Sequence, residues 1–199
     1  MVKQQPINII LLGDPAAGKA TQAQNLMKKF RLYDLDMGRE LRRIDVKTKN
    51  PSLRRELAAT LNKGKLTPTK LVREIFKQVI GSVPKNKGIL FDGTPKMIGE
   101  ARLVKKILDA NGRRNVKVIY LSIPQAETLK RMVGRREYFK GKYSKRADDT
   151  PAALKNRIRY YHKNIAGVKK YFAEIYGLHS ISGMGGRHEV FKRILKQLA

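Results

Sequence analysis

The sequence predicts an α/β protein built as a three-layer sandwich, with a central parallel sheet and helices on both faces. Short apolar runs of strand length alternate with longer segments in which apolar residues recur at helical spacing. This alternation is typical of a parallel sheet covered on both sides. The first apolar run, 7–12, also leads through a turn with two glycines directly into a helical segment. With 199 residues, the chain is long enough for one domain with a substantial core and small inserted lobes.

The expected strands are mostly apolar, as strands buried on both faces of a sheet are. They cover residues 7–12, 88–91, 116–123 and 178–181, and the main helices expected around them cover 18–29, 98–111 and 188–198. Ligands of such sheets bind beyond the carboxyl ends of the strands. Because Gly13 and Asp92 follow directly on two of these ends, we expect the functional site there.

Two stretches interrupt the alternation and are expected to form insertions. Residues 36–65 indicate two short helices without a strand, and Ser52 is expected to cap the second one. Residues 136–147 are polar and aromatic around a central glycine, which predicts a loop or a hairpin. A new helix is expected to follow, with Thr150 as its N-cap and Pro151 in its first turn.

The turn after the first strand has the pattern G-x-x-x-x-G-K, from Gly13 to Lys19. Between a strand and a helix, the backbone N–H groups of such a turn point at one spot and favour an anion there. Lys19 can reach the outer phosphates of a nucleotide, and the hydroxyl of Thr21 can approach Mg²⁺. The alternative is an ordinary turn with a solvated lysine. The residues expected to contact the phosphates are Gly13, Asp14, Pro15, Ala16, Ala17, Gly18, Lys19, Ala20 and Thr21.

The charge of the chain is strongly positive, with 44 Lys and Arg against 16 Asp and Glu and a formal net charge of +28. Such a field raises the encounter rate of anionic nucleotides and produces salt-sensitive, non-specific attraction to RNA or DNA. Most of the basic residues are expected on solvated helix faces. The absence of cysteine excludes disulfides, thiolate metal sites and cysteine nucleophiles. No apolar run has the length needed to span a membrane, and we expect a cytoplasmic monomer.

The residues after the lysine narrow the class of protein. Ala20 separates Lys19 from Thr21, so that the loop reads G-x-P-x-x-G-K-x-T-Q. This arrangement resembles adenylate kinase and other nucleoside monophosphate kinases, and the resemblance extends from Ile9 to the C-terminal helix. It implies reversible, magnesium-dependent phosphoryl transfer from ATP to a nucleoside monophosphate, with AMP as the first choice.

The resemblance also assigns the two insertions and singles out one position of the loop. Residues 36–65 look like the monophosphate-binding lobe, and 136–147 look like a short lid without the metal-binding cysteines of some relatives. Ala16 stands where the family usually has a glycine. A methyl group there is tolerated if the residue keeps φ negative, and it brings the side chain close to the phosphate.

The segment from Asp92 to Lys96, Asp-Gly-Thr-Pro-Lys, resembles the family's D-G-[FY]-P-R motif. A carboxylate at this strand end can hold Mg²⁺ through its waters, beside the phosphates gathered by Lys19. The alternative is a strand-end Asp that caps the next turn. Lys96 replaces the arginine of the motif and keeps its charge without its planar, bidentate grip on a phosphate. The resemblance places Gly93 and Lys96 beside the acceptor.

Four arginines occur in the order and spacing that the family shows around its lid. The resemblance implies that Arg131 lies against the adenine of ATP and that Arg135 meets the transferring phosphates. Arg146 belongs to an R-x-D-D sequence beyond the lid and Arg157 to the next helix, and both are implied to contact phosphates. In a chain this basic, a single arginine would carry little weight. The implied catalytic residues are Lys19, Lys96, Arg135, Arg146 and Arg157.

The acceptor site departs from the family at two positions. Arg42 corresponds to the arginine on the acceptor phosphate, whereas Met37 and Glu100 stand where a threonine and a base-reading glutamine are usual. An ionised glutamate only accepts hydrogen bonds, which suits guanine better than adenine. A surface position for Glu100 is the alternative. Two other functions therefore remain open, a kinase for GMP, CMP or UMP and an RNA-associated ATPase with a phosphate loop and weak kinase activity.

Overall fold

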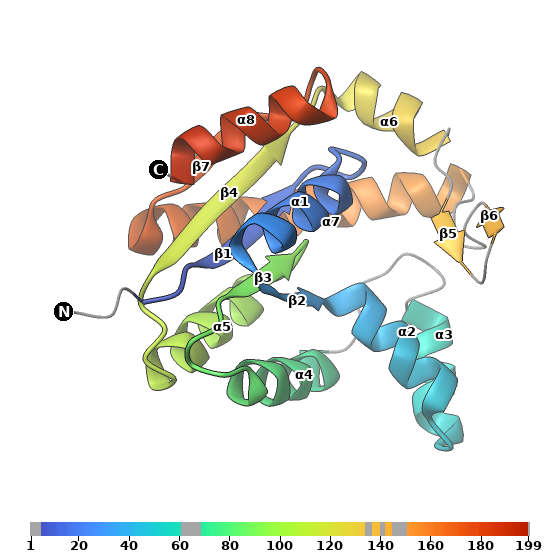
Figure 1. Cartoon of the computed structure of the whole chain (residues 1–199). Helices are drawn as coiled ribbons and strands as arrows, with labels where there is room; N and C mark the ends of the chain where they lie inside the picture. The colour runs from blue at the N-terminus through green and yellow to red at the C-terminus, as the bar shows by residue number, and fades with distance from the viewer. Residues whose placement is uncertain (1–4, 61–68, 134–136, 140–141, 145–150, 199) are drawn as a thin grey trace.

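The computed structural model describes residues 5–60, 69–133, 137–139, 142–144 and 151–198. Within these residues, five strands form one parallel sheet in the order β2-β3-β1-β4-β7. They are β1 (Asn8–Gly13), β2 (Tyr33–Asp36), β3 (Ile89–Asp92), β4 (Val116–Ser122) and β7 (His179–Ser182). Figure 1 shows the sheet running through the middle of the molecule. The predicted α/β class with a central parallel sheet is confirmed.

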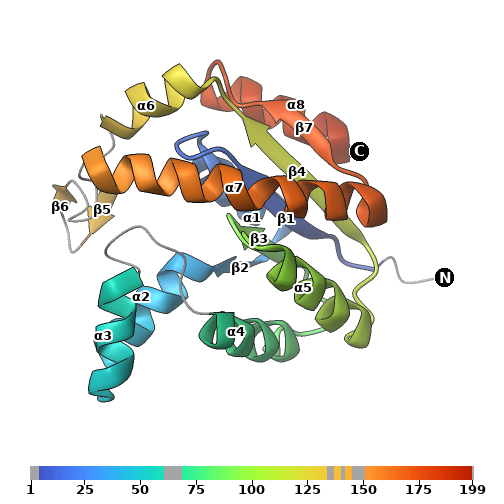
Figure 2. The same cartoon turned by 180° about the vertical axis from the view of Figure 1, so that it is seen from behind.

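Helices cover both faces of the sheet, as Figures 1 and 2 show. On one face lie α1 (Lys19–Phe30) and α8 (Arg187–Leu198), and on the other lie α4 (Thr69–Ser82), α5 (Ile98–Ala110) and α7 (Pro151–Tyr176). The central strand β1 feeds both layers because successive side chains of a strand point to opposite faces. Ile9 and Leu11 belong to the cluster under α1 and α8, whereas Ile10 and Leu12 belong to the other cluster.

Two elements were not anticipated from the sequence, β2 and α4. β2 consists of Tyr-Asp-Leu-Asp and pairs only with β3 at the edge of the sheet. Leu35 is the residue of β2 that is fully buried. A four-residue edge strand with two carboxylates therefore lacks the apolar run that identifies the central strands.

The insertion after residue 36 contains the two short helices expected there, α2 (Met37–Lys47) and α3 (Pro51–Thr60). The prediction that Ser52 caps the second helix is wrong. The Oδ1 atom of Asn50 accepts hydrogen bonds from the backbone N–H groups of Ser52 and Leu53. Pro51 explains this shift, because its fixed φ suits the first helical position and places the cap one residue earlier.

The segment between α6 (Gln125–Val133) and α7 contains a small antiparallel hairpin of β5 (Glu137–Phe139) and β6 (Lys142–Ser144). A loop or hairpin is the structure expected there. The helix predicted to begin at Pro151 does so, while its predicted cap, Thr150, lies outside the described residues. Among the described residues, no helix combines the length and the apolar character that crossing a membrane requires.

Candidate active site

The G-x-x-x-x-G-K turn joins β1 to α1 at the carboxyl edge of the sheet. Gly13 is required by close packing, because a Cβ atom there would lie 2.5 Å from the Leu121 carbonyl oxygen. Gly18 is the N-cap of α1 with φ at +89°, a conformation that favours glycine. The two glycines therefore let the loop curl tightly in front of the N-terminus of α1, which is the arrangement that binds phosphates.

Lys19 folds back over this loop. Its Nζ atom donates to the carbonyl oxygens of Gly13 at 2.6 Å and Asp14 at 2.8 Å. Its Cε atom lies 3.5 Å from the place that a Cβ atom on Gly93 would occupy. The ammonium stem thus passes between the phosphate loop and the segment after β3, where both sequence motifs meet.

Ala16 adopts φ of +61°, so the condition under which a methyl group is easily tolerated at this position is not met. The left-handed conformation costs an L-residue roughly 1–2 kcal/mol. Ala16 is half-buried and packs against Met132 of α6 and Ile158 of α7. The loop therefore holds a non-glycine residue in a glycine conformation, and apolar contact with two neighbouring helices compensates part of the strain.

Asp14 is buried, and its carboxylate points inward to β4. Oδ1 accepts a hydrogen bond from the Tyr120 hydroxyl at 2.5 Å, and Oδ2 accepts one from the backbone N–H of Ile123 at 2.9 Å. Burial, followed by the hydrogen bond to Asp14, raises the pKa of Tyr120, so this phenol stays protonated and donates. Asp14 thus anchors the loop to the sheet, and its backbone is the part that faces the candidate site.

Three carboxylates gather at the ends of β2 and β3, beside Lys19. Asp36 and Asp92 are directly paired across the two strands. Burial, followed by the negative charge of Asp36, raises the pKa of Asp92 to about 6, while the charges of Lys19 and Lys96 act in the opposite direction. Burial also raises the pKa of Asp34. This corner of the site therefore holds carboxylates that are costly to ionise together and that a cation would stabilise.

The N-terminus of α2 is shaped by two of these carboxylates. Asp36 is its N-cap and accepts from the backbone N–H of Arg39, whose guanidinium forms an ion pair with Asp34 at 2.8 Å. Met37 is buried at the first helical position. A Cβ atom on Gly38 would lie 3.4 Å from Nη1 of Arg42, so this glycine leaves room for the guanidinium against the helix backbone.

Glu100 is 4% exposed and sits in the first turn of α5. Its Oε2 atom accepts hydrogen bonds from the backbone N–H groups of Lys96 at 2.9 Å and Met97 at 3.3 Å. Burial raises the pKa of the Glu100 carboxyl although both hydrogen bonds favour its ionised form. Oε2 is thus engaged in capping the helix, and the alternative of a surface residue is wrong.

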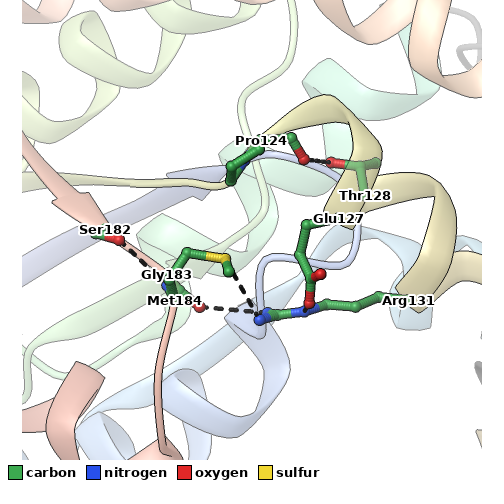
Figure 3. Close-up of polar contacts among 7 residues, drawn as sticks. All are labelled: Pro124, Glu127, Thr128, Arg131, Ser182, Gly183 and Met184. Atoms are coloured by element: carbon green, nitrogen blue, oxygen red, sulfur yellow. Dashed lines mark hydrogen bonds and ion pairs between the residues drawn. The ribbon is translucent and has the colours of Figure 1, made fainter.

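Arg131 connects α6 to the turn between β7 and α8 (Figure 3). Its Nε atom forms an ion pair with Glu127 at 2.5 Å, one turn earlier in the helix. Its Nη1 atom donates to the Gly183 carbonyl at 3.2 Å, and Nη2 lies 3.7 Å from the Met184 sulfur. Contacts to Glu127, Gly183 and Met184 therefore fix the plane of this guanidinium.

The turn at residues 183–186, which we call the β7–α8 turn, is a part of the site that sequence reasoning missed. A Cβ atom on Gly183 would lie 2.9 Å from the Ala17 carbonyl oxygen, so the turn closes directly onto the phosphate loop. Arg193 of α8 donates through Nη1 to the carbonyls of Ser182 at 2.8 Å and Met184 at 2.7 Å. The signal in the sequence is the glycine-rich run Gly-Met-Gly-Gly after a strand, but it matches no motif.

The other predicted site residues fall into three groups. Pro15 and Thr21 are half-buried in or just after the phosphate loop, Ala20 is exposed, and Gly93 follows Asp92 with φ at +64°. Lys96 is exposed next to the carboxylate corner. Arg157 lies in α7, whereas Arg135 and Arg146 lie outside the described residues. Their contacts with substrate stay predictions.

A phosphate loop at the carboxyl edge of a parallel sheet, with a lysine and a strand-end aspartate beside it, defines the class of nucleotide-binding proteins with a phosphate loop. Residues 11–176 match the family model described as adenylate kinase. The chain belongs to the adenylate kinase family, as the sequence predicts, and is an enzyme of the phosphotransferase class.

Curated relatives agree with this assignment over nearly their whole length. The adenylate kinase of Parabacteroides distasonis is 31% identical over 190 residues, which cover 94% of this chain and 95% of the relative. The adenylate kinase of Phocaeicola vulgatus is 29% identical over 189 residues, covering 95% and 96%. That of Bacteroides fragilis is 28% identical over 190 residues, covering 96% and 97%.

Proposed function

We propose that the chain transfers the terminal phosphoryl group of ATP reversibly to AMP, which yields two ADP. The observation that carries this proposal is the junction of the phosphate loop, Lys19 and Asp92 in a chain that matches the adenylate kinase family over residues 11–176. Phosphoryl transfer needs positioning and charge neutralisation more than covalent chemistry by the protein. This site offers cations on one side of the loop and carboxylates on the other.

On the donor side, the loop N–H groups and Lys19 bind the phosphates of ATP. Lys19 then exchanges its two carbonyl partners for phosphate oxygens, which are stronger acceptors because they are charged. The plane of Arg131 and the β7–α8 turn hold the adenine. Residues 136–147 form the lid and bring Arg135 and Arg146, together with Arg157, onto the transferring phosphates while excluding water.

Mg²⁺ fits the donor set at the end of β3. The carboxylate of Asp92 is buried beside Asp36, and its raised pKa supports a role for a nearby cation in stabilising the ionised form. Among the described residues, no group of three or more His, Cys, Asp or Glu side chains is arranged as a metal site. We therefore propose that Asp92 would hold Mg²⁺ through water, beside the phosphates of the nucleotide. The metal supplies neutralisation of charge on the phosphates.

On the acceptor side, residues 36–65 form the monophosphate-binding lobe. Arg42 and Lys96 bind the acceptor phosphate, with Gly93 beside it, and Met37 lies against the base. Glu100 favours AMP when its carboxyl is protonated, because it then offers one donor and one acceptor to adenine as an amide does. Burial raises the pKa of Glu100, whereas its hydrogen bonds from the backbone of Lys96 and Met97 act in the opposite direction.

GMP is a second candidate acceptor, and Glu100 in its ionised form favours it. A carboxylate on the base edge suits guanine, which presents two N–H donors. The Glu100→Gln variant separates the two cases, because the amide serves adenine at every pH. We expect it to lower KM for AMP and to leave KM for ATP unchanged.

The first experiment is ADP formation from Mg·ATP with AMP, GMP, CMP and UMP offered separately. We expect preferential turnover of AMP, with loss of at least about 1000-fold in kcat for Lys19→Met and an unchanged circular dichroism spectrum. Preferential turnover of GMP would change the proposed acceptor from AMP to GMP and leave the proposed mechanism unchanged. No transfer to any acceptor, or near-normal turnover by Lys19→Met, would reject the proposal and favour the RNA-associated ATPase.

The setting of the enzyme is also proposed. We place it in the cytoplasm as a monomer, which agrees with the absence of cysteine. The net charge of +28 supports a non-specific attraction to nucleic acid that weakens with salt.

A further inference from the structure

One exposed face of α7 carries a row of basic side chains. Lys155, Arg159, Lys163 and Lys170 are all exposed. Their spacings of four, four and seven residues place them within about 80° around the helix, in a row roughly 22 Å long. We call these four residues the α7 basic face. Most of the charge of this chain is spread along its length, whereas here it is aligned.

The α7 basic face is not neutralised by acidic residues of its own helix. No Asp or Glu occurs from Pro151 to Ala173, and Glu174 is the first. Other helices differ, because α4, α5 and α6 each pair a basic residue with an acidic one three or four positions away. These pairs are Lys77–Glu74, Lys105–Asp109 and Arg131–Glu127.

The α7 basic face lies on the side of the helix that does not pack into the core. Ile165, Val168 and Phe172 are buried on the side of α7 that packs into the core. Figure 2 shows α7 crossing in front of the sheet in that view, from the β5–β6 hairpin to the far end of the molecule. Exposed Ala166 lies between Lys163 and Lys170 on this face, so a partner can approach the helix closely there, whereas Gly167 faces Ile98 of α5.

We propose that the α7 basic face binds the phosphate backbone of double-stranded nucleic acid, as a second activity independent of the kinase site. A duplex strand carries one phosphate per roughly 3.4 Å of axis, so a row of this length runs beside several phosphates. A membrane surface fits less well, because helices that bind membranes carry large apolar residues beside their cations. Among the described residues of α7, Tyr160 is the one large apolar side chain that is exposed, at 38%.

The test compares two variants with the same change of charge. In the first, Lys155, Arg159, Lys163 and Lys170 are all replaced by Gln. In the matched control, Lys28, Lys29, Lys192 and Lys196 of α1 and α8, which are also exposed, are replaced by Gln. Binding of fluorescein-labelled 20-bp duplex DNA and duplex RNA of one sequence is measured by anisotropy from 50 to 300 mM KCl. Kinase activity and thermal melting of both variants are measured in parallel.

We expect the α7 variant to reduce the slope of log K against log salt by about 3.6, since each lost phosphate contact removes about 0.9. The control variant should change the slope by less than about 1, and both should keep their kinase activity. Both duplexes are measured, and the one that the unmodified protein binds more tightly shows whether the face prefers DNA or RNA.

Three results would overturn the proposal. Equal loss of slope in both variants would mean that binding follows the net charge and not this face. No measurable binding by the unmodified protein at 50 mM KCl would remove the activity altogether. An unchanged slope of the α7 variant on both duplexes would mean that this face does not contact the phosphate backbone. Kinase activity tests the proposed function separately, so the two failures are distinguishable.

Discussion

The two sides of the candidate site are built on opposite principles. On the donor side, Arg131 and Arg193 hold the β7–α8 turn through carbonyl oxygens, and Asp14 holds the phosphate loop. On the acceptor side, Asp36 and Asp92 face each other across two strands, and burial opposes the ionisation of Asp92. Charged side chains thus fix backbone geometry on one side, whereas on the other side buried carboxylates repel one another and are only partly offset by Lys19 and Lys96. We therefore expect substitutions on the donor side to change ATP binding, and substitutions on the acceptor side to change how activity and stability depend on pH.

After that of Lys19→Met, the largest effect is expected at the carboxylate corner, from Asp92→Asn. Turnover should fall by about 100-fold or more, because the proposed magnesium ligand is lost. At the same time the nucleotide-free variant should melt at a higher temperature than the unmodified protein above about pH 6. The measurement is kcat with calorimetry at several pH values.

The sign of this stability change follows from linkage. The pKa of Asp92 rises from 3.8 in the unfolded chain to about 6 in the folded protein, so the folded state holds the proton more tightly. Stability is therefore lost as pH rises between these two values, and Asn removes that loss. The stabilisation should vanish below about pH 4. A variant that melts lower at every pH would show that the carboxylate corner is not electrostatically strained.

On the donor side, we expect a substitution to weaken ATP binding and to leave the rate of phosphoryl transfer unchanged. Replacing Arg193 by Met removes two charge-assisted hydrogen bonds to the carbonyls of Ser182 and Met184. KM for ATP should rise about tenfold, with kcat and KM for AMP unchanged. Arg193→Lys should recover part of the loss, and the exposed neighbour Lys192 replaced by Met is the matched control. Equal increases in both KM values would mean that Arg193 acts on overall stability.

A smaller effect on activity is expected from Asp36, the carboxylate paired with Asp92 across the two strands. Asp36→Asn keeps the N-cap of α2, since asparagine caps as well as aspartate, but removes the charge that raises the pKa of Asp92. The acid limb of the kcat/KM profile should move to lower pH, and activity at pH 6 relative to pH 8 should rise about twofold. Asp109→Asn, remote on α5, should leave the profile in place. An acid limb that does not move would exclude coupling between the two strand ends.

The smallest effect is expected in the phosphate loop itself. Ala16→Gly removes left-handed strain worth roughly 1–2 kcal/mol, but it loses the contact with Met132 and Ile158 and adds freedom to the unfolded chain. The net change in unfolding free energy should be a gain below about 1 kcal/mol, measurable by urea titration. Destabilisation by more than that amount would show that packing of the methyl group outweighs backbone strain.

Sequence patterns report interactions between neighbours along the chain, so features that depend on contiguous residues were predictable. The phosphate loop, the central strands, the helix start at Pro151 and the family all follow from contiguous residues. β2 was missed because a four-residue edge strand with two carboxylates has no apolar run. Asn50 took the role predicted for Ser52 because Pro51 occupies the first helical position.

The sequence by itself determined the class of fold, the family and the chemical parts of the site. Only the tertiary structure brought Arg131 to Gly183, 52 positions further along the chain, and set Asp36 beside Asp92. It alone also decided the left-handed backbone of Ala16 and the inward direction of Asp14. The physical reason is that strand pairing and packing choose which distant segments meet, and no local spacing of residues encodes that choice.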